Sequence, residues 1–163
     1  IKDSFFSAMR RLAASVTIIT TGNGAQQAGL TATAVCSLSA DPPSLIACVN
    51  QNAHAHDLIL SSKRFAVNLL SAEQEQLAIL FADPERATQR FEIAKWHSDD
   101  HDVPLLEGTA ANILCRLERA VDAFTHTIFI GVVEDVILDK SSPLLYGTGS
   151  FGRFISPTNG GTV

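Results

Sequence analysis

Runs of β-branched and small apolar residues, joined by short turns, constrain the fold of this chain more than any other feature. These runs occupy residues 16–21, 29–39, 44–49, 65–70, 109–119, 125–138 and 149–155. Asn23-Gly24 suits a hairpin turn, and Asp41-Pro42-Pro43 ends the second run. No regular crossover helix separates the runs, so about seven strands follow one another through turns. The pattern predicts a mostly β fold: an antiparallel barrel with a few peripheral helices.

Three short segments have the residue pattern of helices. Residues 4–14 carry Phe5, Met9 and Leu12 at helical spacing, and Asp3 or Ser4 would be the N-cap. A second helix of one or two turns is expected over residues 54–61. A third is expected to begin at Ser71, where Gln74 would complete a capping box, and to end near Phe81. Residues 82–104 are polar and predicted to be irregular.

The chain has 163 residues, of which 46% are hydrophobic, 18% charged and only 7% aromatic. This length indicates one domain, which we assign to residues 1–155, followed by a flexible tail at 156–163. The apolar content excludes intrinsic disorder. The surplus of small apolar residues over charged ones is typical of a large core, a subunit interface or a pocket for an apolar ligand.

Charge and cysteine content exclude several classes of function. The formal net charge is −5, and the basic residues form no stripe that could bind nucleic acid. No apolar run approaches the roughly 18 residues of a membrane helix, and the charged start of the sequence is unlike a signal peptide. Cys36, Cys48 and Cys115 lie in apolar runs without a CxxC pattern. We therefore expect reduced core thiols in a cytoplasmic protein.

Two sequence motifs with possible chemistry are set aside. Residues 147–152 match GxGxxG, but no helix or acidic residue follows as a dinucleotide-binding unit requires. His54 and His56, and the His and Asp residues of 97–102, could ligate a metal, yet a polar surface loop predicts the same composition. We predict no metal site.

The segment from Gly29 to Asn50 is the most informative one. In a single strand, Thr31, Thr33, Ser37 and Ser39 would share one face, with small residues on the other. Small side chains let a flat ligand approach the backbone, while residues 50–53 lead into a helix start suited to a phosphate. Spacing alone favours the alternative, a hydroxyl-rich strand with one solvated face.

The order and spacing of motifs along nearly the whole chain resemble the flavin reductase-like family, which has the FMN-binding split barrel. The motifs are Phe6–Met9, Ala14–Thr20, Gly29–Ser37, Asp41–Ser44, Phe65–Ser71, Arg90-Phe91 with Trp96, Pro104–Gly108, His126–Gly131 and Pro143–Tyr146. The resemblance implies an antiparallel split β-barrel that acts as an NAD(P)H:flavin oxidoreductase. It further implies a homodimer that uses NADH or NADPH to reduce FMN or FAD. The reduced flavin would reach, by diffusion, a separate monooxygenase acting on an aromatic or similar small substrate.

The resemblance also implies the residues of the site. His126 would orient the nicotinamide or place a charge near the flavin. The isoalloxazine would be lined by Thr31, Ala32, Thr33, Ala34, Val35 and Ser37, largely through their backbone. Cys48, Val49 and Asn50 would follow the ring or ribityl chain; Asn52, Ala53, His56 and Arg90 would lie near the phosphate; and Tyr146 and Phe151 would frame the nicotinamide cleft.

The chain departs from the family pattern at three places. Phe124-Thr125 precede His126 where many members have Gly-Asp; Gly147-Thr148 follow Tyr146 where many have His or Arg; and residues 52–55 lack the usual Ser or Thr. Whether the protein prefers FMN or FAD, and whether it uses NADH or NADPH, stays open. Two other functions also stay open: a flavin-binding electron carrier or sensor without reductase activity, and a flavin oxidase of the pyridoxamine-phosphate type.

Overall fold

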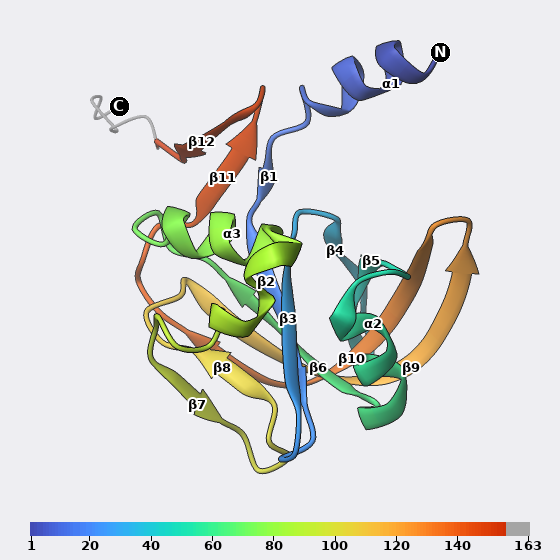
Figure 1. Ribbon diagram of the computed structural model, residues 1–163, viewed down its shortest axis with the longest axis vertical. Coiled ribbons are helices and arrows are strands. Elements are labelled where there is room, and N and C mark those ends of the chain that lie inside the picture. The colour runs from blue at the N-terminus through green and yellow to red at the C-terminus, as the bar shows by residue number, and fades with distance from the viewer. Residues whose placement is uncertain (156–163) are drawn as a thin grey trace, which may run out of the picture.

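The computed structural model describes residues 1–155, whose strands form one seven-stranded antiparallel sheet and two smaller sheets (Figure 1). The large sheet has the order β3–β2–β6–β9–β10–β5–β4. Its strands are β2 (Thr17–Gly22), β3 (Gln27–Ala32), β4 (Val35–Ala40), β5 (Pro43–Asn50), β6 (Arg64–Leu69), β9 (Ala111–Ala123) and β10 (His126–Leu138). The small sheets pair β1 (Ala14–Ser15) with β11 (Leu144–Gly147) and β12 (Ser150–Arg153), and β7 (Trp96–Ser98) with β8 (Pro104–Leu106).

The large sheet is curled into a barrel that stays open along one seam. Strands β3 and β4 are its two edges, yet only Thr33 and Ala34 connect them. Neighbouring Cα atoms are about 3.8 Å apart, so two residues can join these edges only where the sheet curls back on itself. The Cys48 N–H donates to the Ala34 carbonyl at 3.0 Å, which extends the β4–β5 pairing by one residue to the start of this connection. The predicted split barrel is confirmed.

The predicted single strand over residues 29–39 is wrong, because the chain changes edges at Thr33-Ala34. A register shift between Ser37 and Ser39 further alters the alternation of side chains in β4. The expected common face of the four hydroxyl residues therefore does not form. The other predicted strands are present; the last one is β12, and its hairpin partner β11 was not predicted.

Helices α1 (Lys2–Met9), α2 (His54–Ser62) and α3 (Glu75–Ala82) correspond to the three predicted helices. Helix α2 begins at the predicted residue, whereas the other two starts differ from the prediction: Ile1 is the N-cap of α1, and Gln74 that of α3. Ser71 does not cap α3, although its N–H donates to Gln74 Oε1 at 3.0 Å. A 3₁₀ helix, η1 (Pro84–Gln89), lies in the segment expected to be irregular. None of these helices is long and apolar enough to cross a membrane within residues 1–155.

The barrel interior is filled by aliphatic and phenylalanine side chains. Ile19, Val49 and Phe129 are fully buried, and Phe65 is nearly so. Cys115 is buried among them, whereas Cys36 is exposed on β4, so the prediction of core thiols is wrong for Cys36. The candidate tail, residues 156–163, lies outside the described residues.

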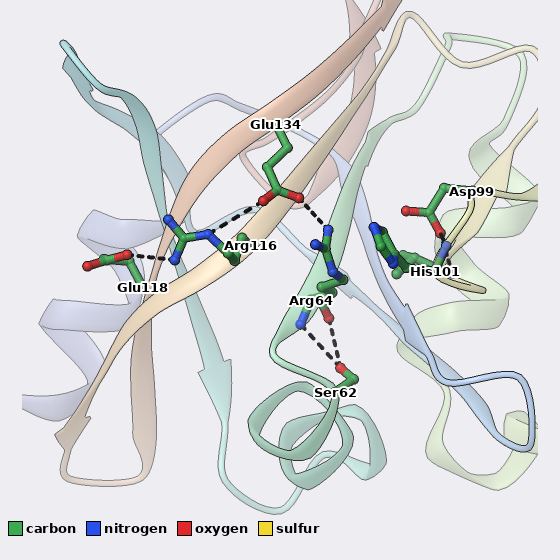
Figure 2. Close-up of polar contacts among 8 residues, drawn as sticks. Ser62, Arg64, Asp99, His101, Arg116, Glu118 and Glu134 are labelled. Carbon is green, nitrogen blue, oxygen red and sulfur yellow. Dashed lines mark hydrogen bonds and ion pairs between the residues drawn. The ribbon is translucent and has the colours of Figure 1, made fainter.

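A polar network joins three strands on the outer surface (Figure 2). Glu134 on β10 pairs with Arg64 on β6 and with Arg116 on β9, and Arg116 also contacts Glu118 at 2.8 Å. These side chains are solvent-accessible, so the pairs contribute little to stability.

Candidate functional site

Two adjoining cavities lie beside the β3 edge of the barrel. The first, here called the α3 cavity, has a volume of about 400 Å³. Its lining is mainly apolar and consists of Val16, Thr31, Ala32, Thr33, Ala78, Ile79, Ala82, Tyr146 and Phe151. The second, the Arg90 cavity, has a volume of about 510 Å³ and shares Thr31 and Ala82 with the first. The two cavities therefore adjoin and share part of their wall, and together they are called the recess below.

The α3 cavity owes its width to small residues and to one hydrogen bond. Ala78 and Ala82 are four residues apart and so occupy one face of α3. Thr31 Oγ1 donates to the Ala78 carbonyl at 2.7 Å, which holds this face against β3. The Thr31 hydroxyl thus positions the cavity wall. The rings of Tyr146 and Phe151 pack at 5.2 Å between centroids at the other side of the recess.

The Arg90 cavity is more polar, with Asn50, Asn52, His54 and Arg90 in its lining. Arg90 is only 8% exposed. Its Nη1 donates to the Gly29 carbonyl and its Nη2 to the Asp83 carbonyl, both at 2.7 Å. Its Nε has no hydrogen-bond partner within the described residues. Burial lowers the pKa of Arg90, and the nearby Asp83 opposes that effect. Arginine stays charged at any ordinary pH, so this cavity holds a fixed positive charge.

The N-terminal end of α2, where the helix dipole is positive, lies at the same cavity. Ala53 is the N-cap and offers no side-chain acceptor to the first-turn N–H groups. Ala53 and His54, the first helical residue, both line the cavity. The helix dipole and the Arg90 guanidinium together favour an anionic group here.

Nine of the predicted site residues gather around these two cavities. They are Thr31, Ala32, Thr33, Tyr146 and Phe151 at the α3 cavity, and Thr31, Asn50, Asn52, Ala53 and Arg90 at the Arg90 cavity. Ala34 is exposed at the seam between β3 and β4. Cys48 is half-buried on β5 opposite Ile128 and lines neither cavity.

Other predicted residues lie elsewhere. Val35 and Ser37 line a separate cavity of about 400 Å³ near β4, together with Ile113 and Val133. The β3–β4 break thus places them at a different cavity from Thr31 and Thr33. Val49 is fully buried in the core, where its side chain cannot contact a ligand.

His56, predicted to lie near the phosphate, and His126, predicted to orient the nicotinamide, both lie outside the lining of the two cavities. His56 is 8% exposed, and its Nε2 and Nδ1 bond Thr127 Oγ1 and Asp57 Oδ1. It lines neither cavity, because it lies on the inner face of α2. His126 is exposed at the start of β10, where its Cα is paired with that of Asn50. Within residues 1–155 no group of His, Cys, Asp and Glu is arranged to hold a metal ion.

The sequence analysis missed several lining residues. Ala78, Ile79 and Ala82 supply the α3 wall, and His54, Pro84 and Ala87 line the Arg90 cavity. The spacing of Ala78 and Ala82 is the one sequence signal that could have indicated a small-residue face on α3.

Comparisons with known proteins agree with this architecture. Residues 9–154 match the family model described as "Flavin reductase like domain". The chain is 37% identical over 154 residues to an FMN reductase (NADH), RutF, of Stutzerimonas stutzeri, covering 94% of this chain and 86% of that protein. It is 38% identical to the reductase component of an FADH(2)-dependent resorcinol hydroxylase of a Rhizobium species, covering 91% and 84%.

A solved flavin reductase also has the same fold over nearly the whole chain. The NADH:FAD oxidoreductase SgcE6 of Streptomyces globisporus, in complex with NAD and FAD fragments, superposes with a TM-score of 0.90. The two are 29% identical, and the match covers 97% of this chain and 95% of that chain.

Proposed function

The chain belongs to the flavin reductase-like family, and from this premise we propose that it transfers hydride from NADH to FMN or FAD. The observation that carries the proposal is the recess formed by the adjoining α3 and Arg90 cavities. Its apolar part suits a flat ring system, and its charged part suits the phosphate of the same molecule. The split-barrel relatives that reduce FMN or FAD support this interpretation.

The α3 cavity fits an isoalloxazine ring. Ala32, Ala78 and Ala82 leave room for a planar group beside the β3 backbone, and Tyr146 and Phe151 provide aromatic surface. The bond from Thr31 to Ala78 fixes the spacing between β3 and α3. These residues would orient the ring and exclude water from it.

The Arg90 cavity fits the flavin phosphate. Arg90 and the start of α2, which has no side-chain cap, line one volume together with Asn52. Since Arg90 is anchored by the Gly29 and Asp83 carbonyls, it would present its charge without reordering. We propose that His54, which lines this cavity, lies near the phosphate in place of His56, which bonds Thr127.

The bound flavin supplies an N5 atom that accepts hydride from nicotinamide C4. The protein contributes alignment, since no side chain needs to donate or remove a proton in the hydride step. We keep His126 as a positioning residue for the nicotinamide. This assignment rests on the family resemblance: His126 is exposed beside Asn50, at the Arg90 end of the recess, and lines neither cavity. His126→Ala should raise the KM for NADH more than it weakens flavin binding; unchanged kinetics would remove His126 from the site.

We also propose a homodimer in the cytoplasm. No residue of α1 is buried, and Phe5, Phe6 and Met9 are each at least 42% exposed on a helix that projects from the body (Figure 1). The exposed Val136–Leu138 end of β10 adds apolar surface. The strand around Ile113–Leu117 is a poorer candidate for this interface, because Leu114, Cys115 and Leu117 are buried. Sedimentation of Phe5→Ser/Met9→Ser beside the wild-type protein tests the dimer.

The partner would be a separate flavin-dependent monooxygenase that receives reduced flavin by diffusion. The similarity to the reductase component of a resorcinol hydroxylase favours an aromatic substrate for that partner. We retain residues 1–155 as the single reductase domain. An oxygenase that stays active when a dialysis membrane separates it from the reductase would support diffusion.

The decisive experiment measures NADH and NADPH oxidation with FMN, FAD and riboflavin. Turnover that depends on added flavin supports the reductase. Flavin binding without NADH oxidation would instead support the electron carrier or sensor. Amine oxidation without NADH would support an oxidase of the pyridoxamine-phosphate type.

A further inference from the structure

A third cavity adjoins the Arg90 cavity and has no part in the proposed reaction. This α2 cavity has a volume of about 560 Å³. It shares Asn52, Ala53 and His54 with the Arg90 cavity, so the two meet at the start of α2. The recess thus continues beyond the proposed phosphate position, from the ring end through the phosphate end into a third volume.

The lining of the α2 cavity is polar but carries no Lys or Arg. Gln26 comes from the turn before β3, Gln51 from the turn after β5, and Asp57 and Ser61 from α2. Leu58 provides the apolar part of the wall. Asp57 uses Oδ1 to contact His56 Nδ1 at 2.7 Å, and its side chain is otherwise open to solvent.

Because of this difference in charge, the Arg90 cavity and the α2 cavity favour different ligand groups. A phosphate is favoured beside Arg90 and disfavoured beside the Asp57 carboxylate. The α2 cavity instead suits an uncharged polar group. Glutamine amides both donate and accept hydrogen bonds, as the edge of an adenine does, and a carboxylate accepts hydrogen bonds from ribose hydroxyls.

We propose that the α2 cavity is a subsite for adenosine and receives the adenosine half of FAD. This inference rests on the proposed function, because it takes the flavin ring and first phosphate as bound in the α3 and Arg90 cavities. The pyrophosphate passes His54, and adenine and ribose occupy the space between Gln26, Gln51 and Asp57. FMN ends at the Arg90 cavity and leaves the subsite empty, so the protein reduces both flavins.

FAD is favoured over NADH as the source of the adenosine. The α2 cavity opens from the phosphate end of the recess, where the second phosphate of FAD must leave. It shares no lining residue with the α3 cavity, beside which the nicotinamide must lie to reach the ring.

The test fills the subsite without touching the other two cavities. Ser61 is exposed near the end of α2, and its hydroxyl donates only to the Leu58 carbonyl. Ser61→Trp should raise the KM for FAD about tenfold relative to the KM for FMN. Ser61→Ala, the matched control, leaves the space open and should change neither. Gln26→Trp, in the hairpin turn, blocks the same volume from the opposite side and provides a second variant if Ser61→Trp fails to fold.

The outcomes separate the subsite from the function. Equal KM values for FAD in the two Trp variants and the wild-type protein would overturn the subsite. A raised KM for NADH with FMN as acceptor would assign the adenosine to NADH and overturn the assignment to FAD. If the wild-type protein oxidises no NADH, the proposed function fails; fluorescence titration of FAD and FMN against the same variants still tests the subsite.

Discussion

His56 Nε2 lies 2.9 Å from Thr127 Oγ1, and this hydrogen bond joins the first turn of α2 to the start of β10. Both side chains are buried, and the imidazole also packs 5.5 Å from the ring of Phe129. His54, two residues earlier, is exposed and lines two cavities. One helical turn thus carries a structural histidine and a candidate ligand-binding histidine.

His56→Ala should lower the free energy of unfolding by about 2 kcal/mol, because it opens a cavity and removes the shortest hydrogen bond of the Thr127 hydroxyl. FMN affinity of the folded variant should not change. Urea unfolding and fluorescence titration measure the two quantities.

His54→Ala is the matched control and should show the opposite behaviour. The free energy of unfolding should change by less than about 0.5 kcal/mol, since the side chain is exposed. FMN should bind more weakly, whereas riboflavin, which has no phosphate, should bind as before. A loss of FMN affinity in the His56 variant alone would reverse the two assignments.

Asn68 is expected to be intolerant of an apolar replacement. It is fully buried; its Nδ2 donates to the Ile18 carbonyl and Thr20 Oγ1, and its Oδ1 accepts from the Leu106 N–H and Asn112 Nδ2. Asn68→Leu keeps a similar side-chain volume but leaves these buried groups without their hydrogen-bond partner. The free energy of unfolding should therefore fall by at least about 3 kcal/mol. Gln76→Leu, on the exposed side of α3, is the control. A loss below about 1 kcal/mol would contradict the role of this network.

Cys115 should be unreactive in the native protein at pH 8, while Cys36 reacts. Burial, followed by the charge of Glu134, raises the pKa of Cys115 from 9.0 to about 12. The folded state therefore keeps a proton that the unfolded chain releases above pH 9, so stability should fall as pH rises from 9 towards 12. Counting thiols that react before and after denaturation checks the first statement, and urea midpoints across this pH range check the second. Rapid labelling of Cys115 in the folded protein would contradict its burial.

Phe124→Gly should stabilise the protein. Phe124 lies in the two-residue turn between β9 and β10 with φ of 59°, and its side chain is fully exposed. A left-handed conformation is strained for phenylalanine and free of strain for glycine. The gain should be about 0.5–1 kcal/mol, detectable as a higher thermal midpoint. Thr125→Gly, at the next position, where φ is not positive, should give no gain. Equal effects at both positions would show that backbone strain is not the cause.

Much of the fold could be predicted from local patterns. The β-branched runs, the Asn23-Gly24 turn and the short α2 and α3 helices all form near their expected residues, because local propensity and apolar burial favour the same structure there. The family motifs indicated the region of the site. The starts of α1 and α3 could not be predicted, since several polar residues compete as caps and packing decides among them.

Only the tertiary structure decided which side chains meet in the recess. Histidines two residues apart on a helix face about 200° apart, and the packing of α2 against the barrel determined that His56 points inward and His54 outward. Likewise, Thr31 and Ser37 belong to one hydroxyl-rich segment, but the curl of the sheet sends the chain from one edge to the other between them. Local residue patterns account for the strands and for the kinds of residue available for a flavin site. The closure of the barrel, which depends on contacts far apart in the chain, determined which of those residues line one cavity.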